Sequence, residues 1–187
     1  MVSIQNTRKL ASFGLAIVMS AASVAAMADV MVGGAPMLPS KDIIDNAVNS
    51  KDHTTLVAAV KAAGLVDTLK GPGPFSVFAP TNAAFEALPA GTVDTLLKPE
   101  NKGTLTTVLT YHVVPGKFDA KAVTQAIQAG GGKATLKTVA GGNLTASTEG
   151  GKVIVTDENG GKATVTIADV MQSNGVIHVV DKVLLPK

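Results

Sequence analysis

Cysteine and tryptophan are absent from the sequence, and arginine and tyrosine occur once each, as Arg8 and Tyr111. Without cysteine the chain has no disulfide, zinc–thiolate site, iron–sulfur cluster or cysteine nucleophile. Charged residues are also scarce, at 16%, against 46% hydrophobic residues. A chain this apolar is not intrinsically disordered, and its 187 residues predict a single folded domain.

The N-terminus has the pattern of a secretory signal peptide. Arg8 and Lys9 precede an apolar run over residues 10–18, and Ala26-Met27-Ala28 supplies a small-residue cleavage site. We therefore predict a signal peptide over residues 1–28 and a mature chain that begins at Asp29 in the periplasm or outside the cell. The alternative is an uncleaved anchor or a mature hydrophobic helix.

The predicted mature chain carries no net charge. Removing residues 1–28 from the 187 leaves 159 residues, with 14 lysines against 14 acidic residues and no arginine. This balance argues against a nucleic-acid partner, which needs a basic patch. No second segment approaches the roughly 18 apolar residues of a membrane span. We expect a soluble, exported monomer without stable membrane insertion.

The pattern of apolar residues changes midway along the chain. Residues 29–39 contain two glycines and two prolines and are predicted to form a flexible leader. Residues 40–187 are predicted to form one domain, in which helical periodicity dominates up to His112. After the glycines at 130–132 the period becomes two, which predicts an α+β fold rather than a doubly wound α/β fold. The candidate strands in this second half are residues 134–139, 143–148, 152–156, 162–168 and 175–184.

The residue types that carry catalysis do not form a recognisable site. The three histidines, His53, His112 and His178, lack metal-ligand spacing. Ser173 and Asp181 do not complete a triad with His178, because His178 and Asp181 point to opposite faces of one strand. We therefore predict no catalytic, cofactor-binding or metal-binding residues and no enzymatic activity. His112 and His178 are expected to be buried and neutral, with lowered pKa values.

Three segments together resemble the signature motifs of the fasciclin domain. They are residues 75–85, the Tyr-His-Val-Val-Pro-Gly sequence at 111–116, and residues 175–186, in the order and spacing of the family. The resemblance implies a wedge of two small β-sheets with helices packed on one side, in a secreted adhesion module without catalysis or cofactors. The residues that we assign to the scaffold of these motifs are Phe78, Pro80, Thr81, Asn82, Phe85, His178 and Asp181.

Tyr111 and His112 are the candidate contacts for a partner. In the animal members of the resembled family, integrin binding maps around this Tyr-His motif, and the helical period places Tyr111 off the apolar face, where we expect it to be partly exposed. The function that follows is an exported, non-catalytic module for adhesion or protein–protein contact with an unidentified protein or cell-surface or matrix component. The alternative is a periplasmic binder of a small apolar or carbohydrate ligand in the wedge between the sheets.

Overall fold

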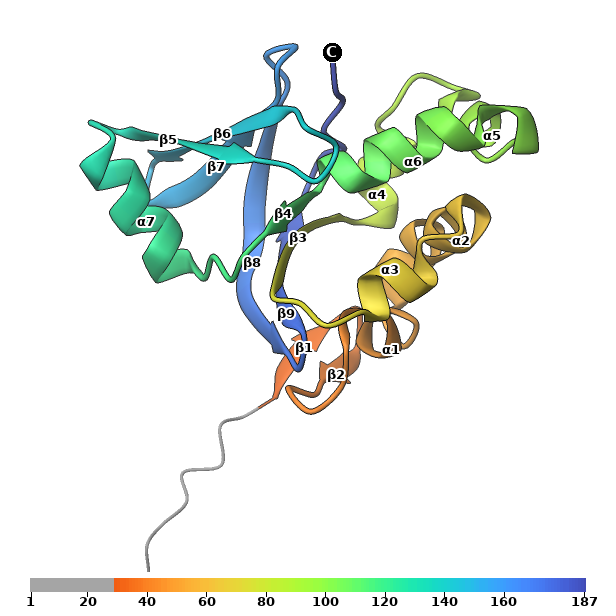
Figure 1. Cartoon of the computed structure of the whole chain (residues 1–187), viewed down its shortest axis with the longest axis horizontal. Helices are drawn as coiled ribbons and strands as arrows, with labels where there is room; N and C mark the ends of the chain where they lie inside the picture. The colour runs from red at the N-terminus through yellow and green to blue at the C-terminus, as the bar shows by residue number, and fades with distance from the viewer. Residues whose placement is uncertain (1–28) are drawn as a thin grey trace, which may run out of the picture.

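The computed structural model describes residues 29–187, so the predicted signal peptide lies outside the described residues (Figure 1). The helices are α1 (Ile43–Ala47), α2 (Thr54–Ala63), α3 (Val66–Lys70), α4 (Asn82–Glu86), α5 (Thr92–Leu96), α6 (Lys102–Tyr111) and α7 (Ala120–Ala129), with short 3-10 helices η1 (Lys51–His53) and η2 (Pro99–Asn101). No helix within residues 29–187 has the length and apolarity needed to cross a membrane.

The strands are β1 (Val30–Val32), β2 (Ala35–Met37), β3 (Phe75–Pro80), β4 (Val113–Pro115), β5 (Lys133–Lys137), β6 (Asn143–Glu149), β7 (Lys152–Thr156), β8 (Lys162–Gln172) and β9 (Gly175–Val180). In the described part of the chain, β3 to β9 form one sheet in the order β4-β3-β9-β8-β7-β6-β5. Only β3 and β9 pair in parallel; the other neighbours are antiparallel.

The long strand β8 joins two arms of the sheet. One arm consists of β3, β4 and β9 and is called the β3–β9 arm, and the other consists of β5, β6 and β7 and is called the β5–β7 arm. The first residues of β8 pair with β7, with Thr164 opposite Ile154, and its last residues pair with β9, with Val170 opposite Ile177. Register shifts between Val165 and Val170, within the part that pairs with β9, bend the strand. The predicted α+β fold is confirmed, and the two predicted sheets are two arms of one continuous sheet. The helices α1 to α6 gather beside the β3–β9 arm, whereas α7 packs on β5 and β6 (Figure 1).

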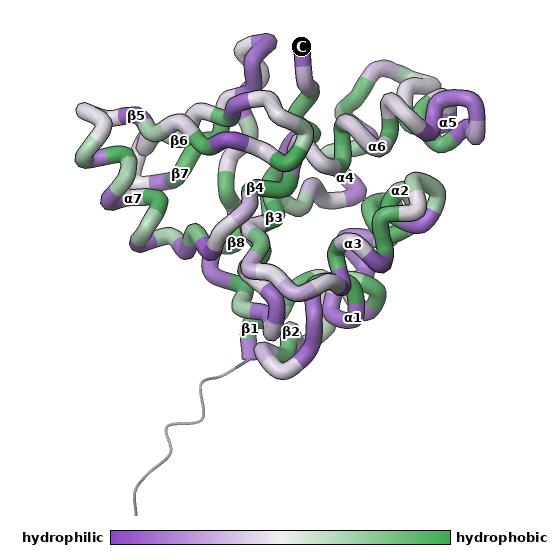
Figure 2. The backbone as a smooth tube through the Cα atoms, viewed as in Figure 1, coloured by the Kyte–Doolittle hydropathy of each residue, from purple (hydrophilic) through white to green (hydrophobic). Residues whose placement is uncertain are grey.

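Two hydrophobic cores lie on opposite faces of the central strands. Figure 2 shows that apolar residues occur both in these strands and in the helices. Val77 and Ile177 belong to the core beneath α1 to α6, and Phe78 and Val180 belong to the core beneath the other arm. Successive strand residues point to opposite faces, so β3 and β9 contribute to both cores. All six residues of β9 are buried for this reason.

The predicted flexible leader is wrong. Its residues form an antiparallel hairpin of β1 and β2, in which Val32 pairs with Ala35. The two-residue turn consists of Gly33 and Gly34, both at positive φ, which glycine adopts without steric cost. Val32 and Met37 are each 3% exposed and pack into the first core. The burial of these two side chains holds the segment against the domain.

Candidate functional site

The Tyr-His motif lies where α6 ends and β4 begins. Tyr111 is the last residue of α6 and His112 is its C-terminal cap. Because α6 lies between the two cores, consecutive side chains enter different environments. Tyr111 belongs to the core beneath the β5–β7 arm, whereas Val108 and Leu109 pack in the core beneath the helices.

Tyr111 is completely buried, so the expected partial exposure is wrong. Its hydroxyl donates a hydrogen bond to the Asn143 carbonyl at 2.8 Å and accepts one from the Glu158 N–H at 3.1 Å. Burial is the main cause that raises the pKa of Tyr111. In this structure the side chain therefore links α6 to β6 and to the turn after β7, and it offers no surface to a partner.

His112 is 2% exposed and has a partner on each ring nitrogen. Its Nδ1–H donates to the Val108 carbonyl at 2.6 Å, and its Nε2 accepts from the Leu184 N–H at 2.9 Å. These two bonds favour the neutral Nδ1–H tautomer, and burial lowers the pKa to about 4. The expected burial and neutrality of His112 are confirmed. Its ring holds the C-terminal segment against α6 instead of facing solvent.

His178 occupies the centre of β9 and is 2% exposed. Its Nε2–H donates to the Phe118 carbonyl at 2.6 Å, and its ring stacks on Phe78 with centroids 5.5 Å apart. Burial is the main cause that lowers the pKa of His178, as expected. Asp181, just after β9, is exposed and accepts a hydrogen bond from the Thr164 N–H at 2.7 Å. His178 and Asp181 therefore have separate partners.

The corner after β3 is built by Thr81 and Asn82. The Thr81 hydroxyl accepts from the Ala84 N–H at 3.3 Å and caps α4. The Asn82 side chain accepts from the Thr55 N–H at 3.0 Å and donates to the Lys51 carbonyl at 2.8 Å. Thr81 thus begins α4, while Asn82 ties that helix to the start of α2.

Pro80 and Phe85 flank this corner. Pro80 ends β3, opposite Val180 of β9. Phe85 is 5% exposed and belongs to the first core. Both side chains are buried, so neither forms part of an exposed contact surface.

The first core contains a cavity of about 40 Å³ that the sequence analysis did not predict. It lies between the β1–β2 hairpin, the helices α1, α2, α3 and α6, and strands of the central sheet. Among the described residues that line it, the polar side chains are Ser50, His53 and His112. The Ser50 hydroxyl and His53 Nδ1 are 2.9 Å apart. Burial is the main cause that lowers the pKa of His53, and a backbone hydrogen bond to Ala79 acts in the opposite direction.

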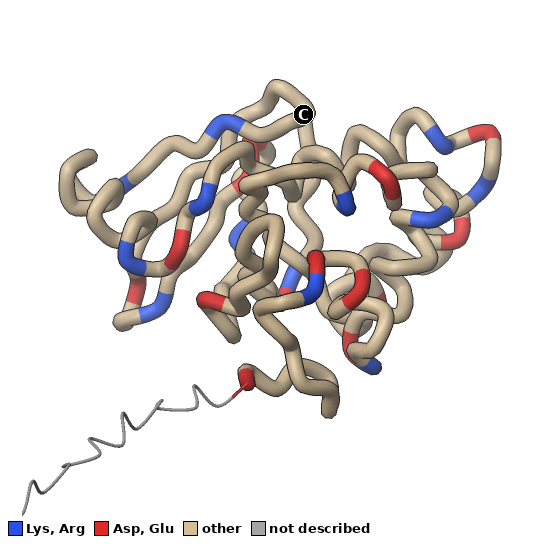
Figure 3. Tube along the Cα trace, turned by 60° about the horizontal axis from the view of Figure 1, so that its bottom comes forward, with Lys and Arg blue, Asp and Glu red and all other residues tan. Residues whose placement is uncertain are grey.

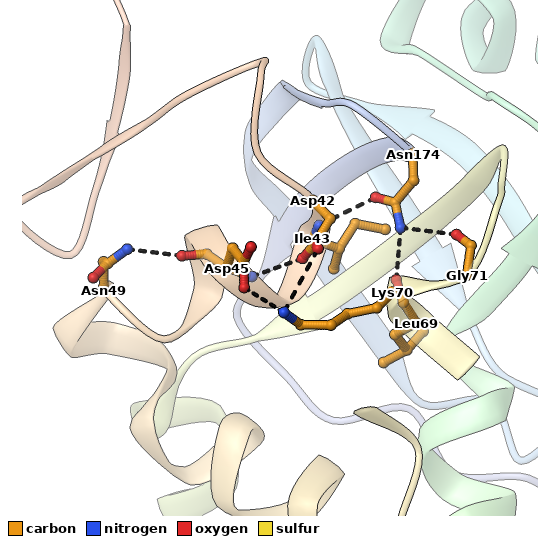
Figure 4. Close-up of polar contacts among 8 residues, drawn as sticks. All are labelled: Asp42, Ile43, Asp45, Asn49, Leu69, Lys70, Gly71 and Asn174. Carbon is orange, nitrogen blue, oxygen red and sulfur yellow. Dashed lines mark hydrogen bonds and ion pairs between the residues drawn. The ribbon is translucent and has the colours of Figure 1, made fainter. Parts of the chain in front are cut away.

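A polar cluster around Asn174 fixes α1, which forms one wall of this cavity (Figure 4). The Asn174 side chain accepts from the Ile43 N–H at 3.1 Å and donates to the carbonyls of Leu69, at 2.7 Å, and Gly71, at 3.2 Å. Beside it, Lys70 Nζ lies 2.6 Å from Asp45. The turn between β8 and β9 is thereby joined to α1 and α3.

The structure places both residues that the sequence analysis proposed as partner contacts in the interior. Tyr111 and His112 are both buried. His53, which the sequence analysis left without a role, is buried beside the cavity. In the described residues no group of three or more histidine, cysteine, aspartate or glutamate side chains is arranged to hold a metal ion.

Comparison with known proteins identifies the family. The fasciclin domain profile matches residues 51–186. Protein sll1483 of Synechocystis sp. is 48% identical over 146 residues, covering 77% of this chain and 73% of that protein. Pig transforming growth factor-beta-induced protein ig-h3 (Sus scrofa) is 37% identical over 157 residues, which cover 79% of this chain and 20% of that protein.

The fold comparison agrees with the sequence comparison. A solved FAS1 domain pair from the insect cell adhesion molecule fasciclin I superposes with a TM-score of 0.70 at 19% identity, covering 78% of this chain and 51% of that chain. The profile match spans most of residues 29–187 and includes all three motifs. This chain therefore belongs to the fasciclin domain family.

Proposed function

We propose that this protein is an exported, non-catalytic interaction module that contacts another protein or a surface component of the cell envelope. The observation that carries the proposal is the fasciclin domain match over residues 51–186. A structural neighbour with the same fold comes from an insect cell adhesion molecule. The proposed location is the periplasm or the cell exterior.

The contact surface proposed here is a groove beside α4 and α5 rather than the buried Tyr-His motif. The groove has a volume of about 230 Å³ and is lined from α2 and from the segment between Phe85 and Val93. Leu88 and Val93 are half-buried, and Glu86 is exposed at its edge. Half-buried apolar side chains beside polar ones are the composition of many interaction surfaces.

The charged residues of the protein do not select a partner of one sign of charge. Figure 3 shows lysines and acidic residues interspersed along the chain, without a separate basic face. A protein or glycan partner is therefore proposed in preference to a nucleic acid.

The test is affinity capture from the envelope fraction of the source organism, with residues 29–187 as bait. The variant Val93→Asp places a charge in the groove. The matched control, Val139→Asp, changes an exposed valine outside it (46% exposed). A defined component is expected to be retained by the wild type and Val139→Asp and lost with Val93→Asp. Because Val93 packs against the first core, circular dichroism must show that Val93→Asp is folded at the capture temperature. Equal recovery with all three baits, or none above a tag-only control, would contradict the proposal.

The cavity supports a second candidate function, the binding of a small ligand. Its lining is dominated by aliphatic side chains, with polar side chains contributed by Ser50, His53 and His112. A carbohydrate needs many hydrogen-bond partners, so this lining favours an apolar ligand. Retention of a bound small molecule by the purified protein in native mass spectrometry would support this function, and its loss on filling the cavity would locate the site.

A further inference from the structure

Two asparagines of this chain are followed by glycine, Asn159 by Gly160 and Asn174 by Gly175. Asparagine is a chemically labile residue, and its amide is lost most readily before glycine. The glycine has no side chain that hinders its backbone nitrogen from reaching the asparagine amide carbon, and its backbone is free to adopt the conformation that this attack needs. The reacting pair is the same at both positions, so a difference in reactivity between them comes from the fold.

The fold holds the Asn174–Gly175 pair in place. The Asn174 side chain makes three hydrogen bonds with the backbone of α1 and of the end of α3 (Figure 4). Gly175 begins β9 and has a strand neighbour on each side, Gln172 of β8 and Phe75 of β3. A Cβ atom at Gly175 would lie only 2.0 Å from the Phe75 carbonyl oxygen. The peptide that joins Asn174 to Gly175 therefore has no room to rotate towards the side chain.

The turn after β7 leaves the Asn159–Gly160 pair open. Both residues are exposed and lie between β7 and β8, outside the sheet. The place of a Cβ atom at Gly160 has no other atom of residues 29–187 within 4 Å. The Gly160 N–H donates to the Asp157 carbonyl at 3.1 Å, a bond that belongs to the turn itself. Rotation of this peptide thus disturbs the turn and leaves the sheet intact.

The Asn159 side chain joins this turn to the end of the chain. Its Nδ2 donates to the Leu185 carbonyl at 2.9 Å and to the Pro186 carbonyl at 3.1 Å. From the same turn, Asp157 Oδ2 accepts the Leu185 N–H at 3.0 Å, and Asp157 Oδ1 accepts the Asn159 N–H at 3.0 Å. Residues 181–187, which we call the C-terminal segment, form neither helix nor strand. Side-chain hydrogen bonds of this kind therefore hold its last residues.

We propose that Asn159 is a modification site, at which spontaneous loss of the side-chain amide yields aspartate or isoaspartate and loosens the C-terminal segment. In the first step the deprotonated Gly160 nitrogen forms a bond to Cγ of Asn159, the bond from Cγ to Nδ2 breaks, and ammonia leaves with the proton. In the second step water adds to one of the two carbonyl carbons of the cyclic imide and opens it. Water is the only other reactant, and the proposal does not depend on the interaction function.

Both products reverse what the side chain offers to the C-terminal segment. The amide nitrogen of Asn159 is a donor, whereas a carboxylate oxygen in its place only accepts and would face the carbonyl oxygens of Leu185 and Pro186. The new charge also lies in the same turn as the carboxylate of Asp157, which repels it. Isoaspartate in addition lengthens the backbone of the turn by one carbon. The C-terminal segment is then expected to open locally while the sheet stays folded.

The first experiment compares the two Asn-Gly sites within one molecule. The purified protein is incubated at mildly alkaline pH, which favours deprotonation of the backbone nitrogen, both in native buffer and in concentrated urea. Peptide mass spectrometry then follows the replacement of amide by carboxylate at Asn159 and Asn174. In native buffer Asn159 is expected to react while Asn174 stays intact, and in urea both are expected to react at similar rates. Equal native rates, or an Asn159 as inert as Asn174, would overturn the modification site.

The second experiment measures the consequence by amide hydrogen exchange at Leu185. In the deamidated protein and in Asn159→Asp this amide is expected to exchange roughly three- to tenfold faster than in the wild type, the effect of one lost hydrogen bond, with the amides of β9 unchanged. Asn49→Asp is the matched control, because Asn49 is also exposed and its Nδ2 also donates to a carbonyl, that of Asp45. This control is expected to leave Leu185 unchanged.

An unchanged Leu185 rate after complete deamidation would overturn the link to the C-terminal segment. Equal acceleration at Leu185 by Asn49→Asp, or equal acceleration of the β9 amides, would show a general loss of stability and would overturn it as well. Asn159→Gln, which keeps an amide but reacts far more slowly, is expected to abolish the native reaction. Persistent native deamidation in this variant would place the reactive site elsewhere.

Discussion

The ring of His112 makes the stability of this domain dependent on pH in a direction that the structure determines. In the folded protein Nε2 accepts the Leu184 N–H, so a proton added there would face another proton. The folded pKa is about 4, against 6.5 for an unperturbed histidine. The unfolded chain therefore binds this proton more readily than the folded one.

The contribution of His112 is fully present above pH 6.5 and is lost as the pH falls from 6.5 towards 4. The difference between these two pKa values corresponds to about 3 kcal/mol of unfolding free energy. Burial also lowers the pKa values of His53 and His178, and their contributions have the same sign. A single variant at position 112 is therefore needed to isolate its share.

The assay is urea unfolding of the wild type and of His112→Asn at several pH values between 4 and 7.5. Asparagine does not titrate and leaves the Leu184 N–H unpaired, so we expect the variant to be less stable at pH 7 by about 1–3 kcal/mol. This gap is expected to narrow as the pH falls to 4, because only the wild type loses the histidine contribution. A constant gap, or a His112 ring that titrates near 6.5 in NMR, would refute the reasoning.

Three further predictions concern the motif residues and the N-terminus. Thr81→Ala removes the cap of α4 and should lower the stability by about 1 kcal/mol. Asn82→Ala loses hydrogen bonds to two segments and should lower the stability by about 1–2 kcal/mol. A double variant that melts like the wild type would show that the corner is misassigned. Tyr111→Phe should lower stability by about 1–2 kcal/mol, because the Glu158 N–H and the Asn143 carbonyl lose their hydrogen bonds to the buried hydroxyl, while envelope capture stays unchanged. Reduced capture at wild-type stability would restore the contact role. N-terminal sequencing of the exported protein should begin at residue 29, and an intact residue 1 on the soluble protein would exclude cleavage.

The second half of the fold was predictable because short antiparallel strands alternate visibly and are separated by glycine turns. The strand over residues 152–156 was predicted with the bounds that the structure shows. The strand predicted over 162–168 extends to Gln172, since its alternation breaks at the register shifts between Val165 and Val170. Its C-terminal part was therefore not visible as a period of two.

The errors arise where burial depends on contacts between distant segments. Three-residue strands such as Val30–Val32 are too short to show a period, although the flanked Gly33-Gly34 pair was an available hairpin signal. Tyr111 was placed outside because a helical period identifies one apolar face, and α6 has a core on each side. The burial of His53 has no local sequence signal, because it arises from the packing around the cavity.

The parallel pairing of β3 with β9 has a consequence for the order of events during folding. Phe75 lies opposite Gly175 and Pro80 opposite Val180, so each pair joins residues 100 positions apart. The entropy of closing so long a loop must be spent before the central ladder can form, which slows folding compared with local hairpins. Because β9 follows the other strands of residues 29–187 and contributes to both cores, neither core can close before residues 175–180 have been synthesised.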